Sequence, residues 1–159
     1  NITSKQSRGK KYLRVQFKNV LFYNFLLSVG LTPAKSKTLG ALKIPDEYFF
    51  DFLRGSFDGD GCTYSYWDKR WRKSFMFYTG FVSSSEAHIE WLRNTIHRLI
   101  GLQGHVTHGS RGRVFHQLKY AKSESITLLR KMYVQKKCTY LKRKRLKIDK
   151  MLRIVGQRL

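Results

Sequence analysis

A helix that ends in acidic residues constrains this chain more than any other feature of its sequence. Pro45, a residue favoured at the first helical position, opens segment 45–61, and a Gly-Asp-Gly run closes it. Asp58 and Asp60 therefore lie at the C-terminal end of the helix, where the backbone dipole favours cations over anions. A bound divalent cation would compensate, because hard ions prefer carboxylate and carbonyl oxygens. The apolar positions that predict a buried surface are Tyr48, Phe49, Phe52, Leu53 and Phe57.

Gly55 and Gly59 lie four residues apart on one face of the same helix. A glycine in a helix interior costs about 1 kcal/mol relative to alanine, so this pair predicts the close approach of a second helix backbone. We expect the interface between the two helices to include Leu53, Ser56 and Asp58 as well. A simpler interpretation stays open at this point, namely a buried helix with a glycine end and two solvated aspartates.

The net charge of the chain points to a polyanionic partner. Lysine and arginine number 32 against 10 acidic residues, a formal charge of +22. Apolar residues at 42% and aromatic residues at 14% indicate a folded domain, and 159 residues can bury one sizeable core. The longest apolar stretch, residues 20–31, is interrupted by Asn24 and Ser28 and is too short to span a bilayer. Nucleic acid is therefore favoured over a membrane as the partner.

Cysteine usage narrows the class of protein further. Cys62 and Cys138 are the only cysteines, which excludes a disulfide framework and a four-cysteine zinc site. No secretory signal is visible, so we expect an intracellular location.

The remaining sequence alternates helical and extended patterns. Before the central helix we expect a loop or frayed terminus at 1–10, a strand at 12–17, a helix at 19–29 capped by Asn19 and ended by Gly30, and a connector at 32–42. After it we expect strands at 62–68 and 74–83, a helix from a Ser83/Glu86 capping box to Gly101, strands at 104–108 and 113–120, a helix capped by Ser123, and a basic helix at about 140–155.

The nine residues Leu53-Arg-Gly-Ser-Phe-Asp-Gly-Asp-Gly61 resemble the signature of the LAGLIDADG homing endonucleases in its L-R-G-x-F-D-G-D-G form. The resemblance implies an α+β fold, in which an α-β-β-α-β-β-α order builds a saddle-shaped four-stranded antiparallel sheet backed by helices and lying on DNA. Residues 45–159 would form one such repeat. Residues 1–44 are interpreted as the remnant of a preceding repeat, because a strand, a helix and Lys35-Ser-Lys37 weakly repeat the order of a strand, a helix and Lys142-Arg-Lys144.

The resemblance also implies an activity, a metal and a partner. The activity is site-specific DNA endonuclease, hydrolysing phosphodiester bonds of a long duplex with Mg²⁺ or Mn²⁺. Asp60 and the carbonyl of Gly59 would hold the metal, Lys144 would lie beside the attacking water, and Lys35 would be its counterpart from the first repeat. For each of them a solvated surface residue is the competing interpretation. The second acidic helix would come from an upstream repeat in the same chain or, alternatively, from a homodimer partner.

Two further groups of residues follow from the expected fold. Ser84 and His88 fall where polar residues of the family support the active-site solvent, with serine where a longer amide is usual. Alternate strand positions should face the groove of duplex DNA. In the strand expected at 74–83, Thr79, Phe81 and Ser83 are assigned to the groove, which leaves Met76, Tyr78 and Val82 for the core. The predicted DNA-binding residues are Cys62, Tyr64, Tyr66, Asp68, Arg70, Thr79, Phe81, Ser83, His105, Thr107, Arg111, Arg113, Gln117, Lys119 and Lys142.

Other functions explain the sequence less well. An intron-splicing maturase or a catalytically inactive DNA- or RNA-binding protein could share the fold, but Asp60 with Lys144 favours the enzyme. A generic basic RNA-binding domain would leave the signature unexplained. A calcium loop starting at Asp58 would need glycine at position six, where the chain has Thr63. His105, His108 and His116 lack a cysteine pair at zinc-site spacing and are interpreted as ordinary strand residues.

Overall fold

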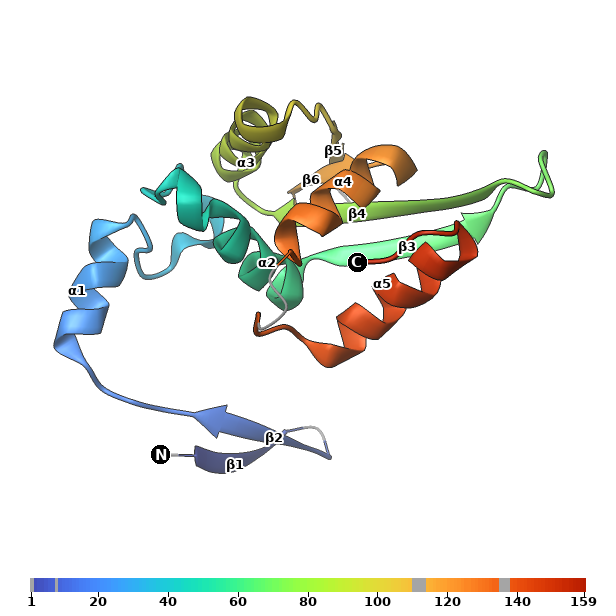
Figure 1. The fold of residues 1–159 in the computed structure, drawn as a ribbon. Helices are drawn as coiled ribbons and strands as arrows, with labels where there is room; N and C mark the ends of the chain where they lie inside the picture. Colours follow the sequence, from blue (N-terminus) through green and yellow to red (C-terminus); the bar gives the residue numbers. More distant parts are fainter. Residues whose placement is uncertain (1, 8, 110–113, 135–137) are drawn as a thin grey trace.

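The computed structural model describes residues 2–7, 9–109, 114–134 and 138–159 (Figure 1). Its elements, in chain order, are β1 (Ile2–Ser7), β2 (Lys10–Val15), α1 (Val20–Ser28), the 3-10 turns η1 (Lys35–Lys37) and η2 (Asp46–Tyr48), α2 (Phe49–Asp60), β3 (Cys62–Trp67), β4 (Phe75–Ser83), α3 (Glu86–Ile100), β5 (His105–Gly109), β6 (Phe115–Tyr120), α4 (Lys122–Met132) and α5 (Lys142–Ile154). No helix within these ranges is long and apolar enough to cross a membrane.

A four-stranded antiparallel sheet organises residues 45–159, with the strand order β3-β4-β6-β5. β4 lies inside the sheet because it pairs with β3 through Cys62↔Gly80 and with β6 through Gly80↔Lys119. Helices α2, α3 and α4 pack on β4, and α5 packs on the edge strand β3. The predicted α+β class, with a four-stranded antiparallel sheet backed by helices, is confirmed.

The core fills the space between one face of the sheet and the helices. β4 contributes Phe75, Phe77 and Phe81, which are all buried. Helices α2, α3, α4 and α5 each add apolar residues at a helical spacing, for example Phe49, Leu53 and Phe57 of α2. Burial of one such side chain stabilises the fold by about 1.5–3 kcal/mol. The basic helix α5 is docked in the same way, through Ile148, Met151 and Leu152.

Elements β1, β2 and α1 lie outside the body formed by the four-stranded sheet and helices α2 to α5 (Figure 1). Residues 1–10 were expected to be a loop, and this prediction is wrong, because β1 pairs with β2 in an antiparallel hairpin. The turn between them holds Gly9 at φ +73°, a left-handed conformation that glycine adopts without strain. Backbone pairing therefore forms these strands although their sequence is polar. The helix expected at 19–29 is confirmed as α1. The Asn19 side chain caps it, since Asn19 Oδ1 accepts a hydrogen bond from the Phe22 N–H at 2.9 Å.

Two predicted helix starts are wrong by about two residues. Ser83 still belongs to β4, opposite His116, and its Oγ accepts a hydrogen bond from the Ser85 N–H at 3.0 Å instead of capping α3. Ser123 lies in the first turn of α4, which begins after Ala121. In both places the end of the preceding strand and the turn after it decide where the helix begins. The capping pattern in the sequence does not by itself predict that position.

The connector before α2 is packed on the main body. Ser85 Oγ donates to the Leu39 carbonyl at 2.5 Å, and Leu42 is buried. The proposed boundary between residues 44 and 45 is therefore crossed by hydrogen bonds, although the division into a remnant and a repeat stays a prediction.

Candidate functional site

Helix α2 ends as predicted, with both aspartates in its last turn. The Gly61 N–H donates to the Phe57 carbonyl at 2.9 Å, and Gly61 itself is extended. A Cβ on Gly61 would come within 2.8 Å of the backbone of Phe57, so only glycine allows the chain to leave the helix this way. The chain then enters β3 directly, which places Asp60 where the helix meets the sheet.

Lys144 supplies a positive charge to this helix end. Its Nζ donates to the carbonyls of Phe57 and Gly61, the latter at 2.6 Å, and lies 3.5 Å from the Gly59 carbonyl. Partial burial and the charge of Arg143 lower the pKa of Lys144, while Asp58 and Asp60 oppose that shift. The cation expected from the helix dipole is thus in part a lysine of the same chain. Lys144 lies beside the Gly59 carbonyl, and its role beside a metal-bound water stays a prediction.

Asp58 has a different role from Asp60. Its carboxylate accepts hydrogen bonds from the Tyr133 hydroxyl at 3.0 Å and the Leu141 N–H at 2.7 Å. These contacts tie α2 to the segment that leads into α5. The Asp58 carboxylate is therefore engaged within the chain, although it was predicted to lie in the interface with a second helix.

Asp60 is exposed and makes no hydrogen bond or ion pair with any residue that the structure describes. It lines a hollow of about 410 Å³ together with Lys35, Ser83 and Ser84. The structure thus brings Lys35, from the N-terminal segment, to the same hollow as the α2 carboxylate. Asp60 and the Gly59 carbonyl are oxygen donors of the kind that Mg²⁺ prefers, and their exposure leaves room for water and phosphate oxygens. These residues fit a hard divalent ion.

His88 holds the connector and does not face open solvent. Its ring is buried, and Nδ1 donates to the Gly40 carbonyl at 3.0 Å. Burial lowers the pKa of His88, which favours the neutral imidazole. Both polar residues expected near the active-site solvent line the hollow with Asp60, Ser84 as an exposed residue and His88 as a buried one that also holds the connector.

The glycines of α2 lie on an exposed face. A Cβ added at Gly55 or Gly59 would have nothing within 4 Å among the described atoms. Leu53 was predicted on this face, and that prediction is wrong, because Leu53 is 0% exposed and packs in the core. The glycine face, as we call it, consists of Tyr48, Phe52, Gly55, Ser56 and Gly59.

One face of the sheet carries most of the predicted DNA-binding strand residues. The register aligns Cys62, Gly80, Lys119 and His105 across the four strands, so their neighbours at every second position share that face. We call it the open face, and its side chains are half-buried or exposed except at Gly80. Its residues are Cys62, Tyr64, Tyr66, Met76, Tyr78, Gly80, Val82, His105, Thr107, Phe115, Gln117 and Lys119.

The predicted orientation of β4 is wrong. Thr79 and Phe81 are 0% and 3% exposed and face the helices, and Ser83 has the same parity. Tyr78 and Val82, which were assigned to the core, lie on the open face. Large side chains lie on both faces of β4, so the sequence pattern does not show which face packs on the helices. The pairing of Tyr78 with Tyr64 shows that Tyr78 lies on the open face.

Three tyrosines form a stacked row on the open face. The ring centroids of Tyr64 and Tyr78 are 4.9 Å apart, and those of Tyr66 and Tyr78 are 6.3 Å apart, with 13° between the ring planes in both pairs. Lys119 and His105 line the shallow pocket beside them. Tyr78 was not predicted as a member of this row. The register of the β3–β4 hairpin, which pairs Tyr78 with Tyr64, is the signal that identifies it.

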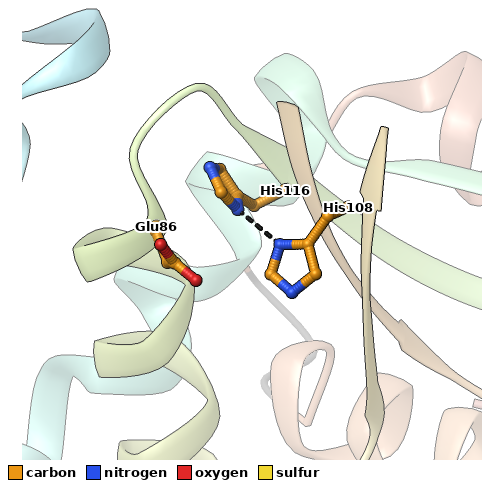
Figure 2. A group of neighbouring side chains, drawn as sticks. All are labelled: Glu86, His108 and His116. Atoms are coloured by element: carbon orange, nitrogen blue, oxygen red, sulfur yellow. Dashed lines mark hydrogen bonds between the residues drawn. The ribbon is translucent and has the colours of Figure 1, made fainter. Parts of the chain in front are cut away.

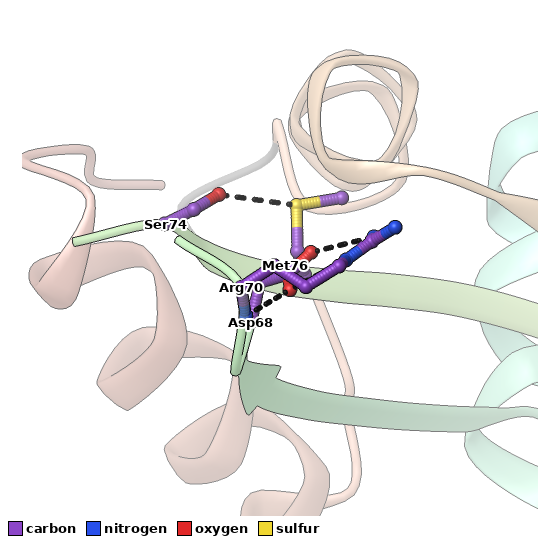
Figure 3. Close-up of polar contacts among 4 residues, drawn as sticks. All are labelled: Asp68, Arg70, Ser74 and Met76. Atoms are coloured by element: carbon purple, nitrogen blue, oxygen red, sulfur yellow. Dashed lines mark hydrogen bonds and ion pairs between the residues drawn. The ribbon is translucent and has the colours of Figure 1, made fainter. Parts of the chain in front are cut away.

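The β3–β4 turn holds Asp68 and Arg70 together (Figure 3). Asp68 accepts hydrogen bonds from the Arg70 backbone N–H at 3.0 Å and from its guanidinium at 3.0 and 3.2 Å. These bonds hold the pKa of Asp68 below its ordinary value. The Arg70 side chain is 82% exposed and the Asp68 side chain 15%, so the cation of this pair is the one that an anionic ligand can reach. Arg111 and Arg113 lie outside the described residues, and Lys142 is exposed at the first residue of α5.

Comparison with known proteins gives a distant likeness to solved structures. No family profile and no curated protein sequence matches the chain. Among solved structures, the homing endonuclease I-CvuI in complex with the I-CreI target, studied in 2 mM Mg with the DNA not cleaved, is similar with 20% identity and a TM-score of 0.38. The matched region covers 55% of each chain, so this chain spans about half of that protein. At this similarity, functional conclusions rest on the residues described above.

Proposed function

We propose that this chain is a LAGLIDADG-type repeat of a site-specific DNA endonuclease that hydrolyses phosphodiester bonds of a long duplex. The observation that carries the proposal is the exposed carboxylate of Asp60 at the C-terminal end of α2, which is unpaired among the described residues and lies next to the carbonyls that Lys144 contacts. An exposed acid at the negative end of a helix dipole is unfavourable unless a cation binds it. A protein that only binds the DNA backbone has no use for this arrangement.

Asp60 and the Gly59 carbonyl would hold Mg²⁺ or Mn²⁺ at the scissile phosphate. A bound divalent ion supplies charge stabilisation and a more acidic water at such a site. Lys144, held by the α2 carbonyls, keeps its ammonium beside this position and would stabilise negative charge that develops on the phosphate. Lys35 would act from the hollow that it lines with Asp60 and Ser84.

A second acidic helix is needed to cut both strands, and two surfaces support a partner that brings it. The glycine face of α2 is open, and α1 is an apolar helix without a buried residue. Leu21 is 81% exposed and Phe25 57% exposed, which is a large apolar area to leave in water. We propose that an upstream repeat of the same protein covers both surfaces, with a second copy of this chain as the alternative occupant.

Gly55→Ala is expected to change the stability of the chain and its association with a partner in opposite directions. The variant chain should be more stable by about 0.5–1 kcal/mol, because alanine is the better helix former and its Cβ meets nothing within 4 Å. Its association with the upstream repeat should weaken, because the Cβ keeps the two helix backbones apart. Chemical denaturation and a pull-down with the upstream repeat measure the two effects. Unchanged association would place the partner elsewhere.

The open face would lie on the DNA, with its tyrosines and polar side chains toward the groove and its cations toward phosphates. The formal charge of +22 supplies the attraction. Loss of each phosphate contact should reduce the dependence of log K on log[salt] by about 0.9.

Lys119→Ala should therefore weaken duplex binding and lower this salt slope by about 1. Lys131→Ala is the matched control, because Lys131 is exposed on α4, which packs on the helix-covered face of the sheet. Fluorescence anisotropy of a labelled duplex, titrated at several salt concentrations, measures both slopes. Equal effects of the two substitutions would show that the open face is not the DNA-binding surface.

A further inference from the structure

A second cluster of metal-ligating side chains lies away from the α2 end. Glu86, His108 and His116 bring one ligand atom each to within 4.8 Å of one another (Figure 2). None of the three lines the hollow that contains Asp60. The proposed endonuclease activity therefore does not account for this cluster.

Sheet geometry brings the two histidines together. His108 of β5 and His116 of β6 are directly opposite in the antiparallel register, and their side chains point to the same side of the sheet. Their Nδ1 atoms are 2.8 Å apart. Two imidazoles at this distance, on neighbouring strands that are paired along five residue pairs, form a preorganised pair of nitrogen ligands. His116 is buried, so its ring is held in place by the surrounding structure.

The third ligand comes from a helix that the same strands position. Ser83 of β4 is opposite His116, and its Oγ accepts the Ser85 N–H, which fixes the turn into α3. Glu86 is the first residue of α3, so its carboxylate comes to the end of the β5–β6 pair (Figure 2). The acidic position at a helix N-terminus also favours the ionised carboxylate that a metal needs.

We propose that Glu86, His108 and His116 form a binding site for a divalent transition-metal ion of the Zn²⁺ class, distinct from the Mg²⁺ site at Asp60. Imidazole nitrogens suit Zn²⁺, Co²⁺ and Ni²⁺, whereas Mg²⁺ takes oxygen ligands. Nitrogen ligands of a tetrahedral ion at about 2.0–2.1 Å lie roughly 3.3 Å apart, so the histidine pair needs to open by only about 0.5 Å. When the ion binds, the ring that donates in the Nδ1···Nδ1 hydrogen bond moves its N–H to Nε2, and both Nδ1 lone pairs become available.

The bound ion would connect α3 to the β5–β6 pair. Three protein ligands leave a fourth position to water. Because the ion binds the folded chain through residues from separate elements, it should also raise the Tm of the protein.

Zinc titration of the 159-residue chain tests the site. The chain should carry Asp60→Asn, so that the α2 end does not contribute, and isothermal titration calorimetry with ZnCl₂ should show one ion per chain. His108→Ala and Glu86→Gln, both at exposed positions, should weaken binding by at least about 10- to 100-fold, since even outer-sphere partners of a metal contribute that much. The Zn²⁺-induced rise in Tm should disappear in the same variants.

Two controls on the same elements make the result specific. His105→Ala removes a histidine from the opposite face of β5, and Glu90→Gln neutralises an acid one turn further along α3. Both should bind Zn²⁺ like the Asp60→Asn parent. Absence of binding in that parent, or equal loss in His105→Ala and His108→Ala, would overturn the proposal. In that event the histidine pair is only a cross-strand hydrogen bond.

Discussion

The substitution Asp60→Asn is expected to slow Mg²⁺-dependent cleavage of duplex DNA by at least about 10²–10³-fold. This is the usual effect of removing one group that stabilises charge in the transition state. The amide keeps the shape of the side chain but loses the charge that would hold the ion. DNA affinity should stay within a few-fold, because Asp60 is exposed and its side chain makes no hydrogen bond or ion pair with another described residue. The rates should be measured by single-turnover cleavage with the upstream repeat present.

Glu47→Gln is the control for Asp60→Asn. It removes the same unit of charge from an exposed position just before α2, so it reports the effect of net charge alone. We expect it to cleave at the parent rate. Full Mg²⁺-dependent cleavage by Asp60→Asn would remove Asp60 from the active site and favour the maturase or the inactive binding protein on this fold.

Leu53→Ala is expected to destabilise the chain by about 2–5 kcal/mol, as buried leucine truncations do. Leu53 is 0% exposed, between Phe49 and Phe57 on the buried face of α2. Its loss would leave a cavity at the centre of the core and lower the free energy of unfolding. The result separates two interpretations of the signature helix, since a leucine on the partner interface would change association and leave the isolated chain's stability intact.

Leu21→Ala is the matched control for this prediction. Leu21 is also a helical leucine, in α1, but it is 81% exposed. Its substitution should change the free energy of unfolding by no more than about 0.5 kcal/mol. Urea denaturation followed by circular dichroism measures both variants, and equal effects would contradict the placement of Leu53 in the core.

Local chemistry made the central helix and its end predictable. Glycine at position 61 is required by the close backbone of Phe57, and the two aspartates before it follow directly from the chain order. The strands β3, β4, β5 and β6 and the helices between them were also expected from their patterns. The hydrogen bonds of Lys144 to the carbonyls at the helix end were not predicted, and its catalytic role, which the resemblance implies, stays a prediction.

Tertiary pairing decided what periodicity could not. β4 has large apolar residues on both faces, so only its register with β3 shows that Phe81 points to the helices and Tyr78 to the open face. Asp58 and Asp60 have the same chemistry. Asp58 accepts hydrogen bonds from Tyr133 and Leu141, more than 70 residues later in the chain, whereas Asp60 has no such partner among the described residues. His108 and His116 meet for the same reason. The sequence by itself determined the elements and the acidic helix end, whereas contacts between distant segments decided which of these residues are available to a ligand.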